Sequence, residues 1–548
     1  MDAILQESTI HRRRERLSKM TEGFGLGDAY GATIERIKAQ CGDKSRLGIA
    51  ALMWISHAER PLRAEELCHA LAVELGSPGF NASNIPSVST LVSCCQGLIT
   101  VDQEASTVRL IHFTLQEYLS AHPDIFTTPH SLMAETCMTF LKSEQFKPIS
   151  VDRYPDLSDT PFLEYCSLYW GVHAKKELSD NARSLALDLL QECDGHISTR
   201  LLLKQIETLD LDSFGPITNF NGLHCASFFG IVEVVTALIE KGCHGVNEGA
   251  FCGLTPLAWA ALNGHERVVE ILLGRGEVDP NKPCDTGQTP LSYAAEGGHV
   301  GVVQMLLRRE NVSPDKPDKC HQTPLSHAAG KGHEGVVKIL LGREEVDPDS
   351  PDYLGITPLS YAAQGGHEGV VKVLHDREEV GPDKPDCCGQ TPLSYAAGRG
   401  REGVVKILLG LEQVNPDRPD DYDRTPLLYA AWNGHEGVVE ILLGREEVSP
   451  DRPDSRGQTP LSYAASCGHE EAVKTLLVLQ EVNPNRPDNR GQTPLMLATS
   501  YGHKRVVALL QSHKAIARHN LKHGRHHFVE TVAIPSLFSE NITPRSRL

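Results

Sequence analysis

A strict 34-residue period orders the apolar and polar positions in the C-terminal part of the chain. The triplet Thr-Pro-Leu returns at eight positions, and most copies continue with two alanines and a Gly-His pair. A degenerate ninth copy, Asn221-Gly222-Leu223, lies one period before the first. Returns at one fixed spacing predict an array of similar supersecondary units. The units begin at Thr255, Thr289, Thr323, Thr357, Thr391, Thr425, Thr459 and Thr493.

Each unit is predicted to contain two short helices and an extended loop, and the copy beginning at Thr323 shows why. Its hydroxyl can cap the first helix, and Pro324 takes the first helical position, where a missing N–H costs nothing. Gly332 suits the left-handed residue that ends this helix. Valine and leucine at helical spacing predict a second helix over residues 334–342. The tract after it is rich in Pro and Asp and predicts a turn.

These units must stack, because one helix pair cannot bury its own apolar face. The segments TPLSYAA, TPLSHAA and TPLLYAA resemble the signature of ankyrin repeats. The resemblance implies a mainly α fold, with an ankyrin solenoid of about nine repeats over residues 216–514 and a basic flexible tail at 515–548. Two features depart from the family. Ser mostly replaces its His after the Leu, and the period is 34 where the family has about 33.

A pattern typical of ordinary globular helices precedes the repeats. Apolar stripes predict three helices, and two short β-type runs on either side of residues 102–107 predict a hairpin. Thr114 and Glu117 predict a capping box for one more helix. Three helices followed by a hairpin indicate a winged-helix-like α+β domain over residues 46–126. The three predicted helices lie near residues 47–55, 64–75 and 88–95.

This segment resembles the winged-helix domain, named after GPI inositol-deacylase, that follows the NACHT nucleotide-binding module in fungal-type signalling proteins. The resemblance rests on ALMWISHAERPLRAEEL from Ala51, GLITVD from Gly97 and VRLIHFTLQEYL from Val108. It implies that residues 1–45 are the helical tail of a missing NACHT-like module, and that residues 127–215 form a helical linker domain. The pattern G-x-x-x-x-G-K-[ST] is absent, so the sequence predicts no phosphate-binding loop.

The composition is that of a folded protein with an acidic excess, since 40% of residues are apolar and 23% are charged. A net charge of −18 argues against nucleic acid or an anionic membrane as the main partner. The longest apolar stretch is far shorter than the roughly 20 residues of a membrane span. Fifteen cysteines show no zinc-ligand or C-x-x-C spacing. We therefore expect free thiols, no membrane insertion and a cytoplasmic location, with the nucleus as the alternative.

The sequence predicts no catalytic chemistry, because the patterns G-x-S-x-G and H-E-x-x-H are absent. We expect no enzymatic activity, no cofactor, no metal and no small-molecule substrate. The repeated Gly-His pairs suggest metal ligands, but successive copies lie one repeat apart, about 10 Å, which favours a structural role in turns. A winged helix suggests DNA binding, yet residues 88–96 contain no Lys or Arg for phosphate contacts.

Residues that vary between copies in the finger loops, and at the exposed end of the first helix, are candidate partner contacts. Ankyrin families bind their partners at these places, and Trp, Tyr and Arg dominate the energetics of interfaces. A column of tyrosines in the 34-residue register is instead predicted to be framework packing. The candidates are Tyr353, Leu354, Arg399, Tyr422, Asp423, Arg424, Trp432, Asn433 and Tyr501.

The main functional hypothesis is a non-catalytic scaffold that binds a protein partner through the concave face and finger loops of the ankyrin array. The alternative is the sensor half of a STAND-type nucleotide-dependent signalling or immune switch, and a nucleic-acid-binding regulator is a third reading. Repeated acid in the fingers predicts attraction of a basic partner. The acidic residues are Glu344, Glu345, Asp347, Asp349, Asp352, Glu446, Glu447, Asp451 and Asp454.

Overall fold

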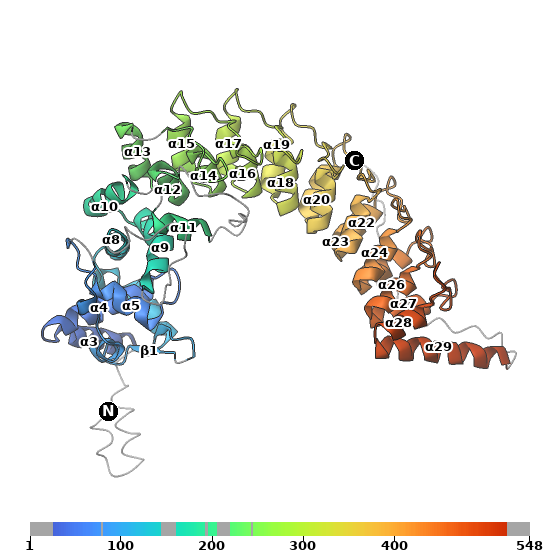
Figure 1. Ribbon diagram of the computed structural model, residues 1–548, viewed down its shortest axis with the longest axis horizontal. Helices are drawn as coiled ribbons and strands as arrows, with labels where there is room; N and C mark the ends of the chain where they lie inside the picture. Colours follow the sequence, from blue (N-terminus) through green and yellow to red (C-terminus); the bar gives the residue numbers. More distant parts are fainter. Residues whose placement is uncertain are drawn as a thin grey trace, which may run out of the picture. The chain divides into compact units, whose positions relative to one another are not determined.

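The computed structural model describes residues 26–77, 80–102, 104–143, 160–191, 196–204, 220–242 and 245–522. The chain divides into two compact units (Figure 1). Unit 1 contains residues 1–328 and 335–347, and unit 2 contains residues 329–334 and 348–548. The described residues form many helices and a single two-stranded sheet, so the predicted mainly α fold is confirmed. Much of the predicted N-terminal segment and of the predicted tail lies outside the described residues.

Unit 1 begins with helices and one hairpin. The two strands pair antiparallel, with Ile99 opposite Leu110. An isolated antiparallel bridge between Arg63 and Thr107 joins the hairpin to the chain just before α5. These elements are α3 (Leu26–Lys38), α4 (Asp43–His57), α5 (Ala64–Ala72), η1 (Ala82–Asn84), α6 (Val88–Cys94), β1 (Ile99–Val101), β2 (Val108–Leu110) and α7 (Phe113–Ala121).

The predicted winged-helix arrangement is confirmed, because α4, α5 and α6 precede the hairpin and α7 follows it. Trp54 of α4, Leu67 of α5 and Leu91 of α6 are buried. Burial of such large apolar side chains contributes to the hydrophobic stabilisation of the domain. The predicted helices are therefore present because their apolar stripes have a common core to face.

The capping box predicted at Thr114 and Glu117 is wrong. Helix α7 begins at Phe113, and its N-cap is His112, whose Nδ1 accepts the backbone N–H of Thr114 at 3.3 Å. The hydroxyl of Thr114 instead bonds the phenol of Tyr30 at 2.8 Å. That contact with α3 occupies the side chain that the local pattern assigned to the cap.

A helical segment follows the winged-helix domain within unit 1. Trp54 lies edge-on to Phe162 at 5.5 Å between ring centroids, and Phe162 lies 5.2 Å from Phe140. This aromatic contact joins α4 to α8 and α9, so the two segments share a core. The elements are η2 (Pro123–Ile125), α8 (Pro129–Leu141), α9 (Phe162–Lys176), α10 (Asp180–Gln191) and α11 (Ile197–Lys204).

Repeated helix pairs lie side by side in both units (Figure 1). Those of unit 1 are α12 (Gly222–Phe229), α13 (Val232–Lys241), α14 (Pro256–Leu262), α15 (Glu266–Leu273), α16 (Pro290–Glu296) and α17 (Val300–Leu307). The division between the units passes through the repeat made by α18 (Pro324–Lys331) and α19 (Glu334–Leu340). Those of unit 2 are α20 (Pro358–Gly365), α21 (Glu368–His375), α22 (Pro392–Gly398), α23 (Glu402–Leu409), α24 (Pro426–Asn433), α25 (Glu436–Leu443), α26 (Pro460–Cys467), α27 (Glu470–Leu477), α28 (Pro494–Ser500) and α29 (Lys504–Lys522).

The repeat beginning at Thr425 shows how the local sequence makes a helix pair. The Thr425 hydroxyl accepts the backbone N–H of Leu428 at 3.3 Å, and Pro426 is the first helical residue. Ala430 and Ala431 are fully buried, and their small side chains let the neighbouring first helices approach closely. Helix α25 buries only one stripe, so each repeat depends on its neighbours to cover its apolar side.

A histidine after the first helix links each repeat to the preceding one. His435 donates from Nε2 to the carbonyl of Gly398 at 3.1 Å, and a Cβ on Gly400 would lie 2.6 Å from the His435 ring. Arg401 takes the histidine position in its own repeat and donates from Nε to the carbonyl of Gln364 at 3.1 Å. The structural role predicted for the turn histidines is therefore the one they have. The same bond is made by His265, His299, His367, His469 and His503.

An aspartate at the base of most fingers holds the turn, and Cys284 takes its position in the finger before Thr289. Asp420 accepts the backbone N–H groups of Tyr422 and Arg424 at 2.8 and 2.9 Å. Neighbouring fingers are joined through the backbone, because Ser455 donates its N–H to the carbonyl of Tyr422 at 2.9 Å. At the finger position where most repeats have a glycine, Asp423 and the equivalent His321 have φ of 60° and 64°, a conformation that Asp and His tolerate better than most residues.

Two further features bear on the sequence predictions. No helix in the described part of the chain combines the length and apolarity needed to cross a bilayer. All cysteines in that part are free thiols. Helix α29 continues to Lys522, beyond residue 514, where the sequence predicted the array to end.

We predict that His435→Ala lowers the stability of unit 2 by about 1 to 2 kcal/mol, because it removes one inter-repeat hydrogen bond and the ring packing on Gly400. His435→Arg is the matched control, and it should lose much less because Arg401 makes the same bond in another repeat. Urea unfolding followed by circular dichroism measures both. An alanine variant as stable as the unchanged protein would contradict this role.

Candidate functional site

Three of the predicted contact residues line one hollow on unit 2. Arg399, Trp432 and Asn433 border a hollow of about 350 Å³ on the first helices α22 and α24. The same repeat position supplies Arg399 and Asn433, which is why consecutive repeats place them side by side. We call this site the aromatic hollow. Its remaining lining residues are Gln364, Gln390, Ser394, Tyr395, Gly398 and Tyr429.

Trp432 lies beside two tyrosines of consecutive repeats. Its ring lies 4.8 Å from that of Tyr463 and 6.5 Å from that of Tyr429, nearly parallel to the latter. The indole remains 36% exposed. A large, partly exposed ring whose orientation is fixed by packing loses little conformational entropy when it binds, which is the property of an interface anchor.

Arg424 joins the adjoining finger to the same aromatic group. Its guanidinium lies over the rings of Tyr422 at 4.6 Å and Tyr429 at 5.1 Å, and it pairs with Asp420 at 2.8 Å. Burial disfavours the charged guanidinium, but the bond to Asp420 leaves the pKa of Arg424 raised. Arg424 is therefore largely occupied within the protein, and it holds the exposed Tyr422 in place rather than offering a free cation.

The other predicted residues are not brought to the hollow. Tyr353 and Leu354 lie in a finger two repeats earlier, and Tyr501 lies two repeats later; all three are exposed and none of them lines the hollow. Asp423 takes the left-handed turn position, so its role is conformational. The structure thus separates one clustered site from scattered exposed side chains.

The tyrosine column is framework, but it also contributes to the hollow. Tyr395 and Tyr429 each donate a hydroxyl hydrogen bond of 2.6 Å to the finger aspartate of their own repeat, and Tyr463 does so at 2.9 Å. Burial and the nearby carboxylate raise the pKa of Tyr463 to about 12, so its hydroxyl stays a donor. Sequence reasoning did not include these rings in the site. Tyr429 lies three residues before Trp432 and four before Asn433, and this helical spacing was the available signal for its ring.

Much of the finger acid is already paired. Asp349 contacts Lys384 at 2.9 Å and Asp451 contacts Arg486 at 3.2 Å. Asp352 and the equivalent Asp454 are buried and hold their turns. The exposed acid of this set therefore comes largely from the four glutamates beside the fingers. They are Glu344, Glu345, Glu446 and Glu447.

The aromatic hollow has no metal-ligand character. The turn histidines beside it donate to backbone carbonyls of the preceding repeat. Among the described residues, one group of three side chains could hold a metal ion, and it lies in unit 1. The group is Glu59, His130 and His173. No sequence pattern pointed to this group, because its members lie far apart along the chain.

Stacked helix pairs, joined by loops that are held by hydrogen bonds, define a helical-repeat protein. Its first helices and finger loops present an exposed aromatic surface. The chain belongs to the ankyrin-repeat family, since residues 223–318, 308–383, 369–454 and 446–522 match the family described as ankyrin repeats (3 copies). Residues 34–127 match the GPI inositol-deacylase, winged helix domain. Both resemblances drawn from the sequence are confirmed. A search of curated proteins found no match.

We predict that Trp432 accounts for nearly all tryptophan fluorescence that acrylamide can quench. The chain has four tryptophans, and Trp54, Trp170 and Trp259 are no more than 2% exposed. Trp432→Phe should abolish the quenchable component, whereas Trp170→Phe should leave it intact. Quenching that persists in Trp432→Phe would show that this ring does not lie at the surface as described.

Proposed function

We propose that this chain is a non-catalytic scaffold that binds a protein partner through the aromatic hollow and the adjoining finger of unit 2. The observation that carries the proposal is the position of Trp432, which is partly exposed, nearly parallel to the ring of Tyr429 and 4.8 Å from the tilted ring of Tyr463. Membership of the ankyrin-repeat family supports it, because the regular framework of such arrays presents variable side chains on one surface.

The chemistry of the hollow suggests what it would accept. Its lining combines aromatic rings with the amides of Gln364, Gln390 and Asn433, and Arg399 is the one charged residue among them. An apolar or aromatic side chain could pack on Trp432 while neighbouring backbone groups bond the amides. This arrangement suits a folded protein surface or peptide segment with one buried anchor and a polar rim.

A basic partner remains part of the proposal, with attraction acting at long range. The chain carries a net charge of −18, and the exposed glutamates beside the fingers add local negative potential. Such a field accelerates encounter with a positively charged protein but contributes less to the strength of the final contact. In this proposal the residues of the aromatic hollow make the contact, and the exposed glutamates provide the long-range attraction.

The proposed setting is the cytoplasm, with the nucleus as the alternative. Free thiols throughout the described residues are compatible with a reducing compartment. We also propose that the protein has no enzymatic activity, which follows from the absence of the hydrolase and zinc-protease sequence patterns named above.

The test of the proposed site is capture of partners on the immobilised full chain, with mass spectrometry to identify them. Trp432→Ala should weaken binding of a captured protein by at least about tenfold, since central aromatic anchors contribute roughly 2 kcal/mol or more. Tyr501→Ala is the matched control, because Tyr501 is exposed but lies outside the hollow. Equal binding by Trp432→Ala and the unchanged chain would refute the site.

Electrostatic attraction of a basic partner leads to a separate prediction. The association rate of the captured partner should fall steeply as salt rises from about 50 to 500 mM, while its dissociation rate changes little. Replacing Glu446 and Glu447 with Gln should reduce that salt dependence without removing binding. An association rate that is insensitive to salt would contradict a basic partner.

A second candidate function is supported by the match of residues 34–127 to the GPI inositol-deacylase winged-helix domain. In that reading, the chain acts as the sensor half of a STAND-type nucleotide-dependent switch, and the winged helix transmits the signal. An upstream reading frame that encodes a phosphate-binding loop would favour it. The nucleic-acid reading has less support, because α6 carries no Lys or Arg, and failure to bind DNA at low salt would eliminate it.

A further inference from the structure

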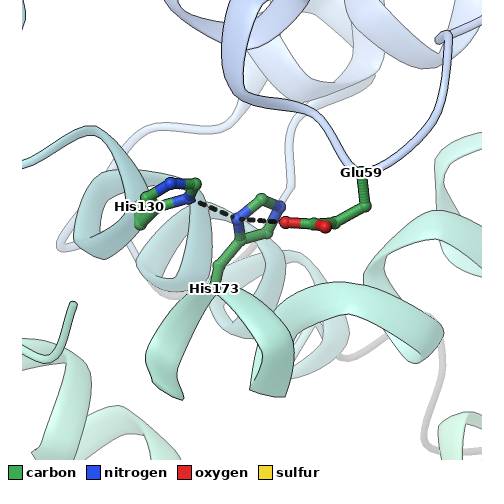
Figure 2. Close-up of side chains that lie close together, drawn as sticks. All are labelled: Glu59, His130 and His173. Atoms are coloured by element: carbon green, nitrogen blue, oxygen red, sulfur yellow. Dashed lines mark hydrogen bonds and ion pairs between the residues drawn. The ribbon is translucent and has the colours of Figure 1, made fainter. Parts of the chain in front are cut away.

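Three polar side chains from separate elements of unit 1 converge at one point (Figure 2). Glu59 follows α4 of the winged-helix domain, His130 lies in the first turn of α8, and His173 lies in the last turn of α9. Their potential ligand atoms all lie within 4.8 Å of one another. Two imidazoles and a carboxylate in this arrangement are a ligand set that zinc and related ions prefer.

The distances suit a small divalent ion. Nδ1 of His130 lies 2.9 Å from Nδ1 of His173, and Oε1 of Glu59 lies 3.8 Å from the same His173 nitrogen. Ligand atoms around a tetrahedral zinc ion are roughly 3.3 Å apart when the bonds are about 2.0 to 2.1 Å long. The two observed distances lie on either side of that value, so small side-chain movements would complete the geometry.

Tyr165 of α9 orients the site from behind. Its phenol oxygen lies 2.9 Å from Nε2 of His173 and accepts the backbone N–H of Glu59 at 3.2 Å. When Nε2 of His173 carries the proton and donates it to Tyr165, the Nδ1 lone pair faces His130 and Glu59. A buried partner that fixes the tautomer in this way is the usual second layer of a histidine metal site.

The surroundings hold both imidazoles in place. His173 is fully buried. Glu177 fixes the backbone beneath His130, because its carboxylate accepts the N–H groups of His130 and Ser131 at 3.1 and 3.2 Å.

Lys176 is the group that an ion would have to replace. Its ammonium lies 2.6 Å from Oε1 of Glu59 and neutralises that carboxylate. The Lys176 side chain is 45% exposed, so it can turn into solvent without leaving a buried charge. A divalent ion beside Glu59 would then take over the neutralising role with stronger and more directional bonds.

We propose that Glu59, His130 and His173 form a zinc-binding site that fastens the winged-helix domain to the helical segment of unit 1. Water fills the fourth position, on the side where Glu59 is exposed. The ion links three elements that otherwise meet through hydrogen bonds and aromatic packing. This site is independent of the aromatic hollow, so either proposal can fail without the other.

Cobalt titration of the metal-free full chain tests the site, because the spectrum of bound Co²⁺ reports its ligands. One Co²⁺ should bind per chain with the visible absorption of nitrogen and oxygen ligands, without a thiolate charge-transfer band, and Zn²⁺ should displace it. Glu59→Gln and His130→Gln should each weaken binding by at least about tenfold. The control is His57→Gln, since the His57 ring lies 5.4 Å from that of His130 but is not one of the three ligands.

Several results would overturn the proposal. The first is a failure of the chain to bind one equivalent of Co²⁺. The second is bound Co²⁺ that shows only the absorption spectrum of thiolate ligands. The third is an equal affinity of Glu59→Gln and His57→Gln for Co²⁺. A second readout guards against a variant that fails to fold. Zn²⁺ should raise the unfolding midpoint of the unchanged chain and of His57→Gln, and it should not do so for Glu59→Gln, whose circular dichroism should match that of the unchanged chain.

Discussion

The close approach of neighbouring first helices is the constraint on which the repeat structure depends. Buried alanine pairs such as Ala430 and Ala431 make that approach possible. The glycine that follows the first helix is subject to the same constraint. Gly434 has φ of 74°, and a Cβ there would lie 2.4 Å from the His469 ring. A left-handed glycine therefore returns in every repeat, with small residues before it and in most repeats a histidine after it; Ile231 and Arg401 take the histidine position in the other two. The 34-residue period is the sequence record of this packing.

A framework held in this way leaves a few positions free to vary. The finger aspartate, the tyrosine that bonds it and the turn histidine are each committed to contacts within or between repeats. The side chains at the last positions of the first helix and at the finger tips do not make these framework contacts. Trp432 and Tyr422 stand at these positions, on a base made rigid by Tyr429 and Asp420. The candidate site thus follows from the stacking, because the framework supplies the rigidity and the variable residues supply the chemistry.

Local sequence rules predicted the elements well, because each cap, turn and apolar stripe is encoded within one repeat or one helix. Thr425 with Pro426 is such a signal. The rules failed where a distant contact decided the outcome. Thr114 does not cap α7, because its hydroxyl is hydrogen-bonded to Tyr30. Asp451 is not a free acid, because Arg486 of the next finger pairs with it. In the site, register identified Trp432 as a candidate, whereas its ring contact with Tyr463 required the structure of two repeats.

Hydrogen exchange at the fingers tests the stacking most directly. The backbone N–H groups of Cys387, Asp421, Ser455 and Asn489 each donate to the preceding finger, at 2.8 to 3.0 Å, and they recur every 34 residues. Their exchange in the native full chain, followed by mass spectrometry or NMR, should be slow and comparable to that of the buried first helices. Exchange of these amides at the rate of an unfolded chain, with the helices still protected, would contradict the account.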